Sequence, residues 1–339
     1  MMQIVVFGPQ RRVGALLQGD RVVDLNLAFS SYLRERGRTS DPRGEADERV
    51  PSQLELFIAG GARTLEDAQR ALEHADEQST LSRAQVKLHA PSIYRPRVAC
   101  AGGNYAKHSA GALAARGEQV SVEEVYRRSR EAGPWGFWKV IAEFAADRDE
   151  VVYPARASRF DYEGEVAVVL GQRASDIPAR RAAEHIWGIT LLNDWSIRND
   201  MGPPRVLNFN LAKNFDTSVS LGPCIVVGEL DPQAIEVQTR VNGEVRQHYS
   251  SEEMTFSFAE FIEYLSRDFT FHPGDLLAGG TGAGTAMDST PAGGDDRLFL
   301  KPGDVVEVSS PAIGTLTNTV VAKGAARRAP AQRRQPAEV

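Results

Sequence analysis

The feature that most constrains the fold of this chain is a succession of short apolar runs that begins at residue 97. Each run is bounded by Gly, Pro or Asp, and the runs read VACAGG, EVAVVLG, IWGITLLND, PCIVVG, EVQTRV, DLLAGG, DVVEVSS and TNTVV. Short apolar runs between turn-forming residues are typical of β-strands. Asn242-Gly243, between two alternating arms, predicts a hairpin with a type I′ turn. We therefore predict an α+β protein that is mostly β.

The first 92 residues have a different pattern, which predicts a small N-terminal α/β domain. Three short apolar runs between residues 3 and 25 predict a small antiparallel sheet, and a helical region follows. We place this domain at 1–92 and the main domain at 93–322. The remaining residues, 323–339, are rich in Ala, Arg and Pro, which predicts a disordered tail.

Three capping boxes predict where helices begin. In each, a serine precedes a glutamate by three residues, so that each side chain can bond a backbone N–H of the first helical turn. The pairs are Ser52 with Glu55, Ser121 with Glu124, and Ser257 with Glu260.

Charge and hydropathy exclude several classes of function. The chain has 39 Lys and Arg against 45 Asp and Glu, a net charge of −6, so no global basic field attracts nucleic acid. No run of about 18 apolar residues occurs, and no basic flank precedes a long apolar segment, which predicts no membrane partner. We expect a cytoplasmic protein in which the only two cysteines, Cys100 and Cys224, are buried and reduced.

A glycine-rich stretch, LLAGGTGAGT at 276–285, invites a dinucleotide-binding interpretation that its context contradicts. The following residues, MDSTPAGG, contain a proline and glycines that oppose the helix a Rossmann turn requires. We interpret the stretch as a strand end whose backbone N–H groups and Thr281 hydroxyl line a pocket for an oxyanion or carboxylate.

Two glutamates in the segment DYEGEVAVVLG predict a site for a hard cation. Glu163 and Glu165 are two residues apart in an extended strand, so they point to the same face. Asp194 comes directly after another apolar strand, a position where sites are commonly built. Carboxylate oxygens suit Mg²⁺, Mn²⁺ or Ca²⁺, which would turn the repulsion among them into attraction. The alternative is a solvated strand end that binds nothing.

One lysine and one histidine occupy positions that suit chemistry. Lys213 lies in NFNLAKNFDTSVSLGP, where apolar neighbours indicate partial burial and a held ammonium; a snorkelling side chain is the alternative. His108 follows VACAGG in the segment GGNYAKHSAG, which suits a base on a mobile lid. Its alternative is a surface or helix-start histidine.

Taken together, these segments resemble the fumarylacetoacetate hydrolase family. The N-terminal RVGALLQGDRVVDLNLA is similar to the small leading domain of that family. The other matching pieces occur in family order between about residues 95 and 322, and they are GGNYAKH, FWK, FDYEGEVAVVLG, GITLLNDWSIRND, LAKNFDTSVSLGP, VNGEVRQ, HPGDLLAGGTGAGT and LKPGDVVEVSSPAIGTLTNTVV.

The resemblance implies a fold and a cofactor. The fold is a mixed β-sandwich roll with a small N-terminal α/β domain, and the assembly is usually a homodimer. The cofactor is Mg²⁺ or Mn²⁺, with Ca²⁺ as a further option, held through carboxylates that match Glu163, Glu165 and Asp194.

The resemblance also implies roles for individual residues. Lys213 matches the lysine that stabilises enolate charge, and His108 matches a lid histidine that helps to activate water. From the same matched segments we predict contacts to a small anionic 2-oxo acid substrate for Arg198, Thr281, Gly282, Tyr105 and Asn208.

Two departures from the family pattern concern hydrolysis. Hydrolytic members often carry a glutamate three residues after the lid histidine, where this chain has Gly111, and a glutamine where this chain has Asn208. The long stretch between the lid histidine and the FWK motif contains its own capped helix. One of its three glutamates, Glu118, Glu123 or Glu124, is a candidate replacement for the missing acid.

The family acts on 2-oxo or 1,3-diketo acids, most often by hydrolysing a C–C bond, and some members decarboxylate, dehydrate or isomerise. We therefore predict a divalent-metal-dependent hydrolase of a small 2-oxo acid such as an acylpyruvate. One alternative is a decarboxylase, isomerase or tautomerase of the same fold. Another is a non-catalytic module that binds small acids.

Overall fold

The computed structural model describes residues 1–17, 20–37, 39–199 and 206–324, without the side chains of 206–208. Its first strands are β1 (Met2–Phe7), β2 (Arg12–Leu17), β3 (Arg21–Asp24), β4 (Thr80–Ser82), β5 (Leu88–His89) and β6 (Val98–Ala101). The middle strands are β7 (Gly136–Lys139), β8 (Glu150–Val152), β9 (Phe160–Asp161), β10 (Gly164–Leu170), β11 (Ile186–Asp194) and β12 (Ser196–Ile197). The last are β13 (Val219–Val227), β14 (Glu236–Val241), β15 (Glu244–Ser250), β16 (Leu276–Thr281), β17 (Val305–Ser310) and β18 (Gly314–Val321).

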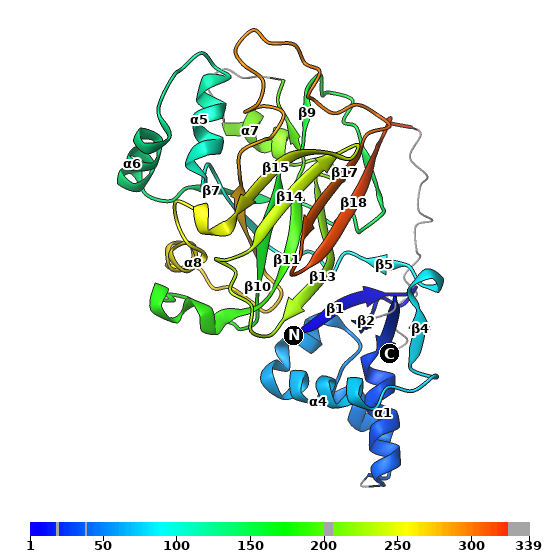
Figure 1. The fold of residues 1–339 in the computed structure, drawn as a ribbon. Coiled ribbons are helices and arrows are strands. Elements are labelled where there is room, and N and C mark those ends of the chain that lie inside the picture. The colour runs from blue at the N-terminus through cyan, green and yellow to red at the C-terminus, as the bar shows by residue number, and fades with distance from the viewer. Residues whose placement is uncertain (18–19, 38, 200–205, 325–339) are drawn as a thin grey trace.

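Helices flank these strands at both ends of the molecule (Figure 1). The N-terminal helices are α1 (Leu25–Arg36), α2 (Pro42–Arg49), α3 (Leu54–Ala59) and α4 (Gly61–Glu73). The later helices are α5 (Ala106–Ala114), α6 (Val122–Ala132), α7 (Val206–Lys213) and α8 (Phe258–Leu265). Short 3₁₀ turns span Arg83–Gln85, Ala179–His185 and Ser251–Glu253.

Two large sheets form the body of the described chain. The main sheet has the order β4-β3-β2-β1-β13-β11-β10-β16-β6-β7, and β5 pairs with β1. The second sheet has the order β15-β14-β17-β18-β8, and β12 pairs with β9 in a separate ribbon. The structure therefore confirms the predicted α+β class with more strand than helix.

Strand β10 lies at the centre of the main sheet and is buried on both faces. Val166 and Val168 belong to the core shared with Val308 of the second sheet. Ala167 and Val169 belong to the opposite core, which includes the N-terminal helices. Because both faces are covered, the strand is apolar from Val166 to Leu170 instead of alternating. Carboxylates at its start therefore enter a buried environment.

The N-terminal strands continue the main sheet. β1 pairs antiparallel with β13, with Ile4 opposite Ile225, and one hydrophobic core includes residues from both parts of the chain. The predicted boundary near residue 92 falls between β5 and β6, and the division into domains stays a prediction. Most of the predicted tail, from residue 325, lies outside the described residues.

Local predictions were confirmed at three positions and wrong at one. Asn242 and Gly243 both have positive φ, 51° and 82°, at the β14–β15 turn, as the predicted turn type requires. Ser121 and Ser257 cap α6 and α8. Ser52 does not cap α3, which begins after Gln53. Its carbonyl instead accepts the N–H of Val13. Among the described helices none is both long and apolar enough to cross a bilayer.

Candidate metal centre and active site

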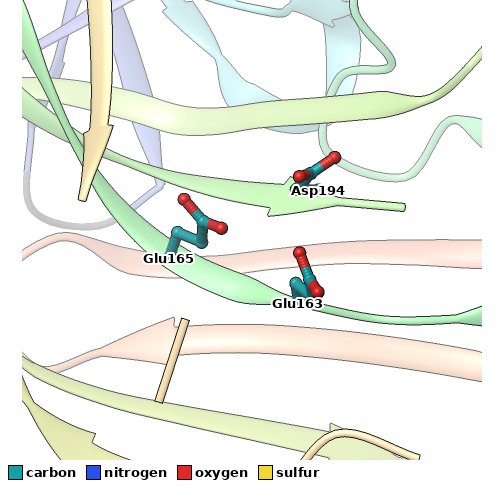
Figure 2. A group of neighbouring side chains, drawn as sticks. All are labelled: Glu163, Glu165 and Asp194. Atoms are coloured by element: carbon teal, nitrogen blue, oxygen red, sulfur yellow. The ribbon is translucent and has the colours of Figure 1, made fainter. Parts of the chain in front are cut away.

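Three carboxylates from two neighbouring strands meet at one end of the main sheet (Figure 2). Glu163 and Glu165 flank the first residue of β10, and Asp194 ends β11. The two strands are held in register there, because the N–H of Asp194 donates to the carbonyl of Glu163 at 2.9 Å. All three side chains are buried, and one oxygen of each lies within 4.8 Å of the others. The structure thus brings the three predicted metal ligands together.

Cations surround Glu163 and keep it ionised. The guanidinium of Arg198 donates to its carboxylate and to Asp161, the latter at 3.2 Å. Lys213 donates to the same glutamate. Burial opposes ionisation of Glu163, but the charges of Arg198 and Lys213 outweigh it and hold the pKa of its carboxyl below the usual range.

Glu165 has the opposite environment. Burial, together with the charges of Asp194 and Glu163, holds the pKa of Glu165 well above its usual range. One of its oxygens accepts the N–H of Gly280 at 3.1 Å, and no ion pair joins it to another described side chain. An ionised Glu165 therefore lacks a cation of its own. A divalent ion held by oxygen ligands would supply that charge, so the donor set fits Mg²⁺ or Mn²⁺.

Lys213, at the end of α7, is a held ammonium and not a snorkelling side chain. Its Nζ donates to Asp194 Oδ2 at 2.8 Å and to Ser196 Oγ at 2.7 Å, and the residue is 4% exposed. Burial disfavours the charged amine, but Asp194 and Glu163 outweigh it and hold the pKa of Lys213 above its usual value. The lysine therefore presents a fixed positive charge beside the carboxylates.

A cavity of about 890 Å³ opens onto this cluster. Asp194 lies beneath it with no exposed surface. The predicted residues that line the cavity are His108, Glu163, Glu165, Arg198, Lys213 and Thr281. Basic, acidic and hydroxyl groups thus converge on one space, as a site for a small acid requires.

His108 lines the cavity from α5 and is oriented by an aspartate that the sequence analysis did not identify. Its Nδ1 lies 2.7 Å from Asp288 Oδ2, and the same carboxylate accepts the N–H of Gly284. A Cβ on Gly111 would lie 2.6 Å from the Cβ of Asp288. The glycine therefore makes room for the aspartate. With Nδ1–H donated to Asp288, His108 presents Nε2 as a proton acceptor.

The glutamates of the stretch 118–124 do not contact the histidine. Glu118 and Glu123 are exposed. Glu124 forms ion pairs with Arg127 and Arg128 on its own helix. The acid partner of His108 is therefore Asp288, and the expected replacement from this stretch is not observed.

Two predicted substrate contacts line a different cavity, and a third has no described side chain. Tyr105 and Gly282 line a separate, smaller cavity of about 350 Å³. The ring of Tyr105 packs edge-on against Tyr249, with 4.9 Å between centroids. The side chain of Asn208 lies outside the described residues.

Two charged residues of the site escaped the sequence analysis although they stand in matched motifs. Lys139 ends β7, in the FWK motif, and its Nζ donates to Asp194 Oδ1 at 2.6 Å. Asp161, in the segment FDYEGE, holds Arg198 and accepts the N–H of Ala286 at 2.8 Å. The available signals were a lysine directly after two aromatic residues for Lys139, and a carboxylate two residues before Glu163 in the same motif for Asp161.

The sequence that forms this site matches the model of a known protein family. The model, described as fumarylacetoacetate (FAA) hydrolase C-terminal, matches residues 97–321. A curated relative, oxaloacetate tautomerase YisK of Bacillus subtilis, is 31% identical over 319 residues, which cover 91% of this chain and 95% of the relative.

Solved structures share the fold. The fumarylacetoacetate hydrolase of the psychrophile Exiguobacterium antarcticum is 26% identical, with a TM-score of 0.71, and the match covers 95% of this chain and all of that one. A maleylpyruvate hydrolase of Sphingobium, solved with manganese(II) and pyruvate, is 20% identical, with a TM-score of 0.68, and the match covers 95% of this chain and 99% of that one.

Proposed function

The chain belongs to the fumarylacetoacetate hydrolase family, and from this premise we propose that it is a metal-dependent tautomerase that interconverts the keto and enol forms of a small 2-oxo acid. The observation that carries the proposal is the buried ammonium of Lys213, fixed beside three carboxylates at the floor of the cavity. The similarity to a relative named oxaloacetate tautomerase supports the same reaction.

The residues can divide the work of tautomerisation. Glu163, Glu165 and Asp194 would hold Mg²⁺ or Mn²⁺, which when bound supplies Lewis-acid stabilisation of negative charge on substrate oxygens. Arg198 lines the cavity with an 11% exposed side chain and offers a guanidinium to the substrate carboxylate. Lys213 stabilises the charge that develops on the C2 oxygen.

The proton is transferred at C3 of the acid. In the keto form, Nε2 of His108 accepts a proton from C3, the C–H electron pair becomes the C2=C3 double bond, and the C2 oxygen takes the negative charge. Protonation of that oxygen gives the enol, and the reverse sequence gives the ketone. Asp288 keeps the imidazole oriented during both transfers.

The direct test follows the absorbance of the enol of oxaloacetate as it decays to the ketone. We expect the purified protein with Mg²⁺ or Mn²⁺ to accelerate this decay above the buffer rate, and EDTA to remove the acceleration. An unaccelerated decay with both metals would overturn the tautomerase proposal for this acid. The binding-module alternative would then be tested by titrating oxaloacetate into the protein in a calorimeter.

C–C bond hydrolysis is a second candidate, favoured by the contact between His108 and Asp288, since an oriented histidine can also activate water. Product analysis separates the two. Hydrolysis of an acylpyruvate consumes water and yields pyruvate and a carboxylic acid, whereas tautomerisation leaves the carbon skeleton intact. We expect no pyruvate release above background. Release of CO₂ from oxaloacetate would instead identify a decarboxylase.

A further inference from the structure

The active-site cavity is much larger than a four-carbon acid needs. Its volume of about 890 Å³ is near the upper end of the roughly 300–1,000 Å³ that pockets for drug-sized ligands occupy. A substrate the size of oxaloacetate, bound at the carboxylates, would leave most of this volume unoccupied by the substrate.

One wall of the remaining space is aromatic and begins at the catalytic lysine. The Nζ of Lys213 lies 5.2 Å from the ring centroid of Phe137. Phe137 meets Phe209 edge to face, with 5.1 Å between centroids. Phe209 in turn lies 6.2 Å from Trp135. All four residues line the cavity, so an apolar surface extends outward from the charged floor.

The outermost ring of this wall has a fixed position. A Cβ on Gly102 would lie 2.5 Å from the indole of Trp135, so the ring packs directly against the backbone of that glycine. The carbonyl of Trp135 accepts the N–H of Gly102 at 2.9 Å. The side chain of Trp135 is nevertheless 53% exposed. The indole of Trp135 is thus held in place with much of its surface exposed, so an aromatic ring of a ligand can stack on it.

Further lining of the cavity comes from the helical pair α5 and α6, which lie together beside α7 and β7 in Figure 1. The apolar residues that they contribute to the cavity are Ala112, Leu113 and Val125. Helix α6 is part of the stretch between the lid histidine and the FWK motif. Apolar side chains of α5 and α6 therefore line the same cavity as the aromatic wall.

We propose that this outer part of the cavity is a tail subsite, lined by Trp135, Phe209 and α5–α6, that selects 2-oxo acids carrying an aromatic ring beyond C4. The inference rests on the proposed function, because the acid end is taken to bind at the carboxylate cluster. The ring would displace water from apolar surface and stack on the fixed indole.

The test compares two acids of different length on the Mg²⁺-loaded protein. The first is oxaloacetate, and the second is 4-phenyl-2,4-dioxobutanoate, which adds a phenyl ring beyond the C4 carbonyl. We expect kcat/KM for ketonisation, and the affinity measured by calorimetry, to favour the phenyl acid. We expect Trp135→Ala and Phe209→Ala each to lower the phenyl-to-oxaloacetate ratio of affinities by roughly 3–10-fold.

Two matched variants make the outcome decisive. Trp135→Phe keeps a ring on the wall and should restore most of the ratio. Tyr264→Ala removes an aromatic ring that is 43% exposed on α8, outside the cavity lining, and should not change the ratio. A wild type that binds oxaloacetate more tightly, or an unchanged ratio in both alanine variants, would overturn the tail subsite. Binding that follows these expectations without any turnover would support the subsite and overturn only the tautomerase proposal.

Discussion

At the scale of single residues, Asp194 shows how the site balances charge. Each of its carboxylate oxygens accepts from a different lysine, Lys139 at 2.6 Å and Lys213 at 2.8 Å. Glu165, which has no such partner among the described side chains, relies on a backbone N–H. The negative charge of Asp194 is therefore balanced by two lysines before a metal ion binds. The negative charge of an ionised Glu165 is not balanced by any described side chain.

We predict that Glu165→Gln weakens Mg²⁺ and Mn²⁺ binding by at least about 100-fold, because loss of a residue that only orients a ligand already costs 10–100-fold. The substitution keeps the size of the side chain and removes its charge. Calorimetric titration of the metal ion measures the change, with the exposed Glu48→Gln as the matched control. Unchanged affinity in Glu165→Gln and in Asp194→Ala would contradict the metal site.

A second prediction concerns the proton-transferring histidine. His108→Ala should lower kcat for ketonisation by about 10²–10⁴-fold, the usual contribution of a positioned acid–base group. Asp288→Asn should lower kcat by a smaller factor and leave KM nearly unchanged, because Asp288 acts through the imidazole. Steady-state kinetics on oxaloacetate provide both constants. Full activity of His108→Ala would refute the assignment, and a change confined to KM would refute the positioning role of Asp288.

The sequence was sufficient to identify the carboxylates and their partners Lys213 and Arg198, but not the partner of His108. Glu163 and Glu165 are found by their spacing in a strand, a local property. Asp288 and His108 are 180 residues apart, and no local pattern relates them. The space that Gly111 leaves for Asp288 likewise depends on the tertiary structure. The partner of His108 is set by the fold, so it is identified only when the loop that carries Asp288 is placed.

At the scale of elements, α8 shows a helix start that the sequence determines fully. Ser257 accepts the N–H of Glu260 at 3.2 Å, and the glutamate accepts the N–H of Ser257 at 2.8 Å. Arg130 of α6 also contacts this glutamate at 2.8 Å. Ser52 has the same spacing to Glu55, but α3 begins one residue later, after Gln53, and the carbonyl of Ser52 accepts the N–H of Val13 at 2.8 Å. The serine–glutamate spacing alone therefore does not fix where a helix begins.

We predict a pH-dependent effect of Glu260→Gln on stability. Burial opposes ionisation of Glu260, but the Ser257 N–H and Arg130 outweigh it and hold its pKa below the usual value. A lowered folded-state pKa stabilises the protein above the unfolded pKa, about 4.3 for a glutamate. A glutamine can still accept the Ser257 N–H, so Glu260→Gln removes the charge, which contributes about 0.3–1 kcal/mol near a helix N-terminus. This loss should therefore be complete at pH 7. It should shrink as the pH falls below about 4.

Urea unfolding of the wild type and Glu260→Gln at several pH values measures this difference. The exposed Glu48→Gln serves again as the control and should show no comparable pH-dependent loss. A difference in the free energy of unfolding that is constant between pH 7 and pH 3 would contradict the charge-dependent part of the cap.

At the scale of the whole molecule, the main sheet joins the N-terminal part of the chain, residues 1–92, to residues 93–322. β1 pairs with β13 and shares a core with strands of the main domain. This pairing could not be predicted from the sequence, because the pattern of an apolar strand does not indicate which distant strand it pairs with, here one more than 200 residues away. The strands themselves and their turns were readable, since those depend on local spacing and on Gly, Pro and Asn.

We predict that residues 1–92 and 93–322 unfold together. Because they share hydrogen bonds and a core, separating them exposes both, so one cooperative transition is expected. Differential scanning calorimetry of the intact chain should give one peak with equal calorimetric and van't Hoff enthalpies. Circular dichroism should give a coincident midpoint. Two resolved transitions would show that the N-terminal part is an independent domain.

The pairing of β1 with β13 also determines how long β1 remains incompletely paired while the chain is being synthesised. About 200 residues separate the two strands, and a ribosome adds roughly 5–20 residues per second. The edge of β1 at Met2–Ile4 therefore waits on the order of 10–40 s for β13. β2 can cover the other edge at once, and β5 can pair with Val6 and Phe7 once it is made. During that interval the nascent chain carries an open strand edge, the kind of surface that chaperones cover and that other chains can join. The N-terminal strand is the first part of the main sheet to be made, yet its pairing along Met2–Ile4 is completed only when β13 has been made.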